Sequence, residues 1–221
     1  MTQFDGLEPL AVETTSGVIA KRIRAAIVDG TLPPGLQLAE ARLARHLAVS
    51  RGPVREAMQR LIQEGLLRSE RHRGVFVVEL GFDDVADVYL ARAAVERAAV
   101  NSIVRRCDPA VIEALEQVLD DMRRAAAADG WDDVARDDLR FHGALVAAAG
   151  SDRLLRMFHT LEAESRMCLT ALEANYTEWQ DLVAEHEAIA DALRRFDRDW
   201  ALALLDEHFE SARRSLWGTR E

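Results

Sequence analysis

The chain has 221 residues but only two cysteines, Cys107 and Cys168, which lie far apart and in no paired motif. This excludes a disulfide framework and makes a reducing cytoplasm the expected compartment. Aromatic residues make up only 6% of the chain, and there are 12 glycines and 5 prolines. A β-sandwich needs more turn residues and more aromatic or β-branched positions, so these low values favour a helical protein.

Long apolar runs are also absent. No uninterrupted apolar segment approaches the roughly 20 residues that a transmembrane helix requires. The first residues include acids and lack the basic and apolar segments of a signal peptide. We therefore expect a cytoplasmic protein with no membrane partner.

Positive charge is scarce overall but concentrated in one segment. The whole chain carries a formal net charge of −10, yet residues 16–79 hold eleven basic and six acidic residues, which leaves +5 there and −15 elsewhere. A basic segment is what DNA phosphates attract. The acidic remainder is expected to stay clear of DNA.

The first 79 residues predict a flexible arm over residues 1–14 and a small domain over residues 15–79. Apolar residues at helical spacing begin at Val18, and Gly30 ends the first helix. The further expected elements are helices over residues 39–47 and 50–65 and β-prone runs at 66–69 and 75–78. Three helices and a hairpin in so short a segment predict a winged helix-turn-helix.

The remainder, residues 80–221, has a helical pattern throughout and predicts a second domain. Gly and Asp-Pro pairs mark the breaks between its helices. The expected helices are 84–106, 109–127, 131–149, 152–175, 178–196 and 199–217. The fold class is thus mainly α: a winged helix-turn-helix followed by an antiparallel bundle of six to seven helices.

Residues 15–79 resemble the DNA-binding domain of the GntR family of transcription regulators. The resemblance is carried by the run from Leu38 to Met58, with Pro33-Pro34-Gly35 before it and Glu64-Gly65-Leu66-Leu67 and Gly74-Val75-Phe76-Val77 after it. This implies binding to palindromic operator DNA by a homodimer.

Arg51 and Arg55 are the main candidates for reading bases. They lie at i and i+4 near the start of a helix, so both project from one side. Ser50 at this helix start is expected either to cap the helix or to contact a phosphate. Arginine binds guanine through two hydrogen bonds, and a helix N-terminus attracts phosphate. The alternative is a solvated basic face. The full set of candidate DNA-binding residues is Arg42, Ser50, Arg51, Gly52, Arg55, His72, Arg73 and Gly74.

The helical region resembles the FCD ligand domain of the FadR branch of this family, through residues 138–145, 185–189 and 206–209. The resemblance implies that four residues on different helices converge on a divalent metal: Asp138, His142, His186 and His208. Spacing alone places only Asp138 and His142 on one helix face. Zn²⁺ is the first expectation, with Ni²⁺ and Mn²⁺ as the others.

The resemblance also places a small carboxylate effector beside Arg92 and Glu96, with Arg166 as a further candidate. Arginine pairs well with a carboxylate because its planar fork meets both oxygens. The alternative for Arg92 and Glu96 is an i,i+4 ion pair on the surface. His46 and His159 lie outside the pattern and are expected to be surface or packing residues.

These observations predict a ligand-responsive DNA-binding regulator, most simply a repressor, that is not an enzyme. Two alternatives remain at this point. One is the same regulator with a purely structural metal and another effector. The other is a metal-dependent hydrolase, because a histidine-rich site with open positions can activate water.

Overall fold

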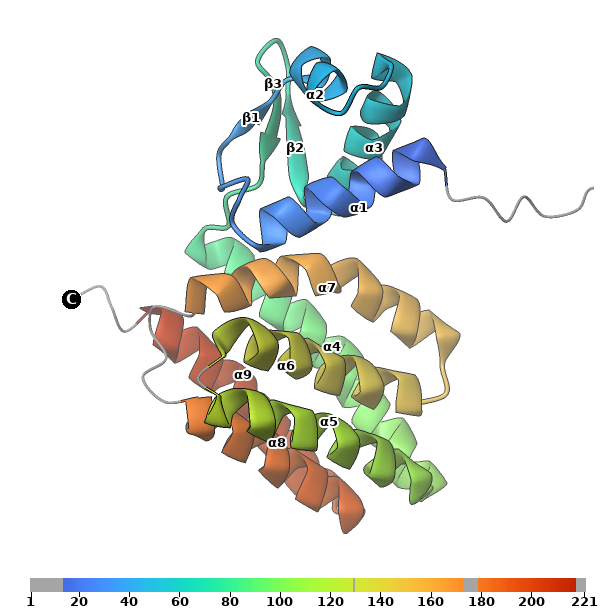
Figure 1. The fold of residues 1–221 in the computed structure, drawn as a ribbon. Helices are drawn as coiled ribbons and strands as arrows, with labels where there is room; N and C mark the ends of the chain where they lie inside the picture. Colours follow the sequence, from blue (N-terminus) through green and yellow to red (C-terminus); the bar gives the residue numbers. More distant parts are fainter. Residues whose placement is uncertain (1–13, 129, 173–178, 218–221) are drawn as a thin grey trace, which may run out of the picture. The chain divides into compact units, whose positions relative to one another are not determined.

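A computed structural model describes residues 14–128, 130–172 and 179–217. The chain divides into two compact units, Met1–Val78 and Glu79–Glu221. Each unit is considered separately (Figure 1). The expected arm over residues 1–14 lies outside the described residues except for Thr14, whose side chain caps the first helix.

The N-terminal unit is a winged helix-turn-helix, as predicted. Its elements are α1 (Thr15–Val28), β1 (Gln37–Leu38), α2 (Glu40–His46), α3 (Arg51–Gln63), β2 (Leu67–Glu70) and β3 (Gly74–Val77). The strands form an antiparallel sheet in the order β1-β3-β2. The short strand β1 was not predicted, because a strand of two residues is too short to show the alternation of apolar and polar side chains.

The core of this unit lies between α1 and α3. Ile19, Ile23 and Ile27 recur on one face of α1 and are buried, as are Val54 and Leu61 on α3. Burial of apolar surface of this kind stabilises a fold by about 25 cal/mol per Å². This packing fixes α3 and leaves its N-terminal turn exposed.

The C-terminal unit is helical throughout its described residues. It comprises α4 (Phe82–Arg106), α5 (Ala110–Ala127), α6 (Trp131–Ala148), α7 (Asp152–Leu172), α8 (Trp179–Arg194) and α9 (Arg198–Trp217). The predicted end of one helix at residue 175 and the start of the next at 178 fall on residues 173–178, outside the described part. Pro109 was expected to be the first helical residue, but it is the N-cap of α5, and the Asp108 carboxylate accepts a hydrogen bond from the Ala110 N–H.

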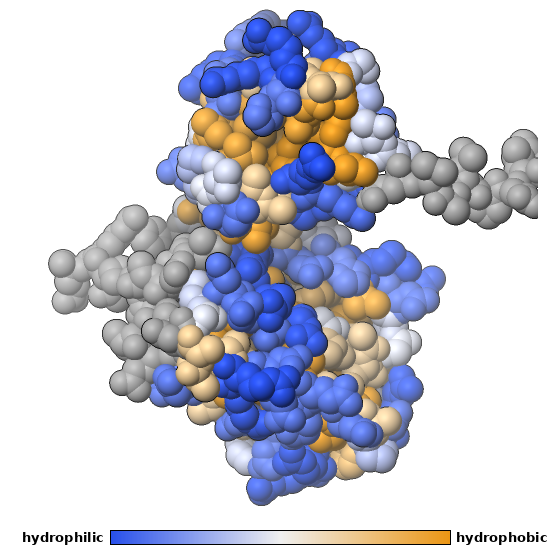
Figure 2. Space-filling model, viewed as in Figure 1, coloured by the Kyte–Doolittle hydropathy of each residue, from blue (hydrophilic) through white to orange (hydrophobic). Residues whose placement is uncertain are grey.

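In this unit α6 packs against α4, α5, α7 and α8, while α9 packs against α4 and α8 (Figure 1). The face of the unit seen in Figure 2 is mainly hydrophilic, with small apolar areas between the charged side chains. None of the described helices is long and apolar enough to cross a membrane. The arrangement brings the inner faces of α4, α6, α8 and α9 close together.

Candidate functional site

The first candidate site is the N-terminus of α3. Ser50 is the N-cap by position, with an extended backbone, but its side chain makes no capping hydrogen bond. Ser50 therefore occupies the predicted N-cap position without a side-chain hydrogen bond to the helix, and the residue is exposed. Arg51 and Gly52 are exposed beside it, and a Cβ at Gly52 would meet nothing within 4 Å. The space around Gly52 would therefore accommodate a side chain.

Arg55 lies one turn further along α3 and forms an ion pair with Glu40 at the start of α2. Its Nε and Nη2 atoms donate to the two carboxylate oxygens at 2.9 and 2.8 Å. The pair lowers the pKa of Glu40 through the hydrogen bond from Arg55. Arg55 therefore remains on the same exposed side as Arg51, but its guanidinium is held by a carboxylate that the sequence analysis did not assign to it.

The hairpin between β2 and β3 carries the other predicted DNA-binding residues at its tip. His72 has a positive φ of 64°, and Gly74 has a φ of 114°. A Cβ on Gly74 would lie 2.9 Å from the Gln37 side chain, which donates a hydrogen bond to the Arg73 carbonyl. Glycine is required here by the backbone, so Gly74 shapes the tip, while the side chains of His72 and Arg73 are exposed.

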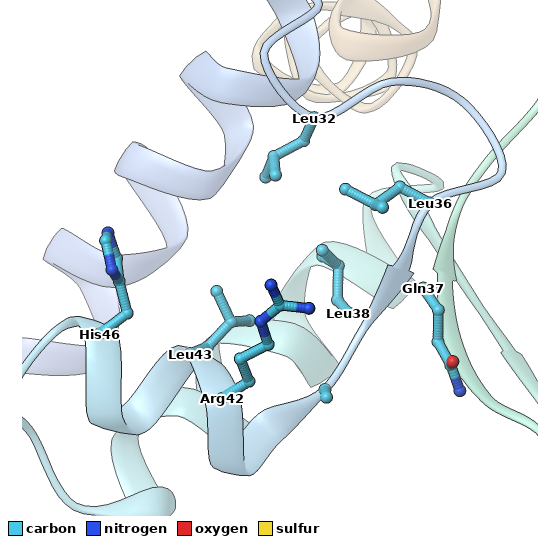
Figure 3. A pocket seen from close by; sticks show the side chains of 8 residues that line it. Leu32, Leu36, Gln37, Leu38, Arg42, Leu43 and His46 are labelled. Carbon is cyan, nitrogen blue, oxygen red and sulfur yellow. The ribbon is translucent and has the colours of Figure 1, made fainter.

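Arg42 on α2 borders a pocket of about 310 Å³. Figure 3 shows Leu32, Leu36 and Leu38 around this pocket, with the Arg42 guanidinium pointing toward their side chains. His46 is exposed and lies at the pocket's edge. The orientation of Arg42 in this structure is thus toward apolar neighbours in its own unit.

The second candidate site is a buried cluster in the helical unit. Asp138 and His142 on α6, His186 on α8 and His208 on α9 each offer a ligand atom, and these atoms all lie within 4.8 Å of one another. Each of the four residues is at most 4% exposed. The structure therefore brings together all four residues that were predicted as ligands.

The imidazole rings meet through their Nε2 atoms. The Nε2 of His142 lies 3.2 Å from the Nε2 of His208 and 3.2 Å from that of His186. Two ligands at about 2.1 Å from one ion are about 3.4 Å apart in a tetrahedral arrangement, so these distances are close to those expected for a shared cation. Two ligands at this distance from one ion can be at most about 4.2 Å apart, so the four ligand atoms, which lie within 4.8 Å of one another, would draw slightly closer around a bound ion.

Each Nδ1 atom of the cluster contacts a fixed oxygen on its outer side. The Nδ1 of His142 lies 2.6 Å from Glu96 Oε2, that of His186 lies 2.7 Å from the Leu182 carbonyl, and that of His208 lies 2.7 Å from Glu185 Oε2. When each Nδ1–H donates to its oxygen, three Nε2 lone pairs face one point. Such outer contacts are typical of histidines that bind metals.

The charges of the cluster also favour a cation. Burial opposes ionisation of Asp138, but interactions with His186, His142 and Arg92 hold its pKa below the usual range. Burial and the nearby Arg92 charge lower the pKa of His142, which keeps that ring neutral. Neither oxygen of Asp138 accepts a well-formed hydrogen bond among the described residues, although Oδ1 lies 3.2 Å from His186 Nε2. A buried carboxylate facing three imidazole nitrogens fits the requirements of a divalent metal.

Arg92 and Glu96 lie on the inner face of α4 and are buried, so a surface ion pair is excluded. Their exposed fractions are 1% and 0%, and Arg92 Nε donates to Glu96 Oε1 at 3.1 Å. The guanidinium also lies over the rings of Tyr89 and Phe209, at 5.8 and 5.1 Å from their centroids. Arg92 Nη2 has no hydrogen-bond partner within the described residues. Because Glu96 contacts both Arg92 and His142, it links the arginine to the cluster.

The remaining candidates lie elsewhere. Arg166 on α7 donates a long hydrogen bond of 3.4 Å to the Asp132 carbonyl at the start of α6. His159 is exposed and contacts Glu162 on the same helix. Glu185 was missed, although its place directly before His186 was visible in the sequence. No local sequence pattern indicates its contact with His208, which lies on another helix.

Comparison with known proteins gives two family matches. Residues 15–77 match the model of bacterial regulatory proteins of the gntR family, and residues 87–211 match the FCD domain. The chain is 31% identical to a probable D-xylose utilization operon transcriptional repressor from Paenarthrobacter nicotinovorans, over 88% of this chain and 87% of that protein. It is 26% identical to the gluconate operon transcriptional repressor of Bacillus licheniformis, over 91% of this chain and 84% of the relative.

A solved structure is similar over both units. A GntR transcriptional regulator from Rhodococcus sp. RHA1 superposes with a TM-score of 0.79 at 30% identity, covering 93% of this chain and 99% of that one. The matched families and relatives are transcription regulators and not enzymes, which removes the hydrolase alternative. With a winged helix-turn-helix before an FCD domain, the chain belongs to the GntR family, in its FadR-like branch, and is a DNA-binding transcription regulator.

Proposed function

We propose that this regulator is a homodimeric, cytoplasmic repressor that senses a small carboxylate at a metal held in its helical unit. Each N-terminal unit would read one half of a palindromic operator with α3, while the hairpin contacts the DNA backbone or minor groove. Two similar proteins carry the word repressor in their names, which supports repression and not activation of transcription.

The proposed metal ligands are Asp138, His142, His186 and His208. Three imidazole nitrogens and one carboxylate oxygen suit Zn²⁺, and they also suit Ni²⁺ and Mn²⁺. The ion would supply a positive centre with open coordination positions for a carboxylate. The protein orients the ligands through Glu96, the Leu182 carbonyl and Glu185.

The observation that carries the effector proposal is the Arg92 side chain. It is buried beside the cluster, and its Nη2 atom has no hydrogen-bond partner among the residues that the structure describes. An unsatisfied buried donor on a charged group is costly, so a ligand carboxylate that accepts from it would bind favourably. We assign Arg92 to the effector, whereas Glu96 holds Arg92 and His142 in place; Arg166 is the weaker candidate.

The test is calorimetric titration of a panel of mono- and dicarboxylates into the metal-loaded protein, the metal-free protein and the Arg92→Ala variant. Acid affinity should fall about 10- to 100-fold in Arg92→Ala, as expected for a lost charge-assisted hydrogen bond. Metal content should be unchanged, because Arg92 is not a ligand. Arg105→Ala, on the same helix but exposed, is the matched control. Equal acid affinity in all samples would reject both the metal-bound pose and the role of Arg92.

A purely structural metal is the second candidate, since four protein ligands could suffice for stability. Chelation separates the two cases. A structural ion would lower the melting temperature when removed and leave the response of operator binding to acids unchanged. A sensing ion would abolish that response.

Glu96→Gln tests the outer contact of His142. Removing the carboxylate charge beside the ring should lower metal affinity about 10- to 100-fold, because such partners set the orientation and basicity of the ligand. Glu162→Gln is the control, since Glu162 contacts the exposed His159 in a similar way. Metal affinity measured by competition with a chromogenic chelator should fall in the first variant and not in the second. An unchanged affinity for Glu96→Gln would show that the contact does not support the metal.

A further inference from the structure

The tip of the hairpin between β2 and β3 is held partly by a residue outside the hairpin. Gln37 lies on β1 opposite Phe76 of β3, and β1 exposes Gln37 while it buries Leu38. Figure 3 shows these two side chains of β1 leaving the strand on opposite sides, as alternate residues of a strand do. The Gln37 side-chain amide donates a hydrogen bond of 2.5 Å to the Arg73 carbonyl at the tip. The contact therefore joins the hairpin tip to a strand 36 residues earlier in the chain.

Gly74 provides the space for this contact. It lies two residues before Phe76 and therefore on the same face of β3, the face that Gln37 shares. A Cβ on residue 74 would lie 2.9 Å from Gln37 Nε2, so a larger residue would displace the amide. The hydrogen bond restrains the peptide between Arg73 and Gly74, next to the residue type with the most backbone freedom. Gln37 thus restrains the tip at the point where the backbone would otherwise move most easily.

The Arg73 side chain is oriented by the same face of the sheet. Its guanidinium lies 5.5 Å from the centre of the Phe76 ring and forms an ion pair with Glu70 of β2. Arg68 contacts the same ring, at 5.6 Å, and the same carboxylate. The Arg73 side chain nevertheless remains 71% exposed. The tip therefore presents an accessible cation whose backbone is held by Gln37 and whose side chain is held by Glu70 and Phe76.

We infer that Gln37 is a positioning residue for DNA binding, which holds His72 and Arg73 in the orientation that meets the nucleic acid. The inference rests on the hairpin contact of the proposed function and adds the residue that prepares this contact. A tip that is ordered before binding loses less conformational entropy when DNA arrives, so affinity is higher. The tip needs such restraint, because His72 has a φ of 64°, which is uncommon for a residue other than glycine.

The experiment uses Gln37→Met in the full-length protein, because methionine has a similar length and cannot donate the hydrogen bond. Fluorescence anisotropy at one fixed salt concentration should show about 3- to 10-fold weaker binding, the factor expected when side chains must be ordered on association. The loss should be similar for an operator selected from random duplexes and for unselected duplexes, since phosphate contacts carry no sequence information. Gln63→Met makes the same exchange at an exposed residue at the end of α3 and should leave binding unchanged.

A double-mutant cycle separates positioning from a general structural role. In a His72→Ala/Arg73→Ala background the positioned side chains are gone, so adding Gln37→Met should weaken binding less than about 2-fold. In the DNA-free protein, NMR order parameters of the Arg73 and Gly74 amides should fall in Gln37→Met and not in Gln63→Met.

Two results would overturn the positioning role of Gln37. One is an operator affinity of Gln37→Met equal to that of the parent, and the other is an equal loss in both backgrounds of the cycle. A His72→Ala/Arg73→Ala variant that binds the operator as tightly as the parent would instead overturn the hairpin contact of the proposed function, and the role of Gln37 with it.

Discussion

Loading the metal-free protein with Zn²⁺ should raise its melting temperature by about 5–10 °C when the free ion is at 100 times its dissociation constant. Binding to the folded state alone then stabilises by about 2.7 kcal/mol, and 1 kcal/mol shifts the melting temperature of a chain this size by about 2–4 °C. Differential scanning calorimetry with and without the ion measures this. The same measurement with Ni²⁺ and Mn²⁺ ranks the three ions.

His186→Ala and His208→Ala should each abolish most of this shift, because each removes one nitrogen of the cluster. His159→Ala is the matched control, since that histidine is exposed on α7 and away from the cluster. Elemental analysis should find one ion per chain in the parent and the control. Absence of metal in the parent after incubation with all three ions would contradict the assignment of the cluster.

The pH dependence of metal binding follows from His186. Burial lowers its pKa, but the interaction with Asp138 outweighs burial, and the net shift is upward. The metal-free site therefore retains a proton on this ring at a higher pH than an ordinary histidine. A metal must displace that proton, so apparent metal affinity should rise with pH until the ring is neutral and then level off. Metal titrations at several pH values test whether the apparent metal affinity rises with pH.

Local sequence signals predicted most of the fold. Glycine and proline marked the helix ends, and apolar spacing identified the helices of the second unit to within a few residues. The signals failed where a contact depends on residues distant in the chain. The pairing of Gln37 with Phe76 that creates β1, and the ion pair between Arg55 and Glu40, join segments that carry no mutual pattern.

The cluster in the helical unit shows the same limit. Asp138 and His142 share a helix face by spacing, but nothing local to His186 or His208 says that they face the same point. Resemblance to a family supplied that expectation. Burial of Arg92 and Glu96 was not predictable from their i,i+4 spacing, because such a pair can face solvent or the interior. The tertiary packing of α4 decided between the two.

Arg51→Ala should weaken operator binding by about 1–3 kcal/mol and relax the preference at the base that it contacts. Arg51 is exposed in the first turn of α3, where the helix N-terminus also favours a phosphate. Arg55→Ala should weaken operator binding by a similar amount of free energy. Its guanidinium is already oriented by Glu40, so Glu40→Ala should weaken binding as well, through the lost orientation of Arg55.

The operator sequence for these measurements comes from selection of random duplexes with the parent protein. Fluorescence anisotropy at one fixed salt concentration then compares the variants, because affinity for DNA depends steeply on salt. His72→Ala and Arg73→Ala at the hairpin tip should weaken binding to all sequences with little change in preference. Arg60→Ala, in the last turn of α3, is the control for loss of one positive charge on that helix. If Arg51→Ala binds the selected duplex as tightly as the parent, or loses affinity equally for selected and random duplexes, α3 does not read bases through this residue. Stronger binding by Glu40→Ala would show that Glu40 competes with DNA for Arg55 and does not position it.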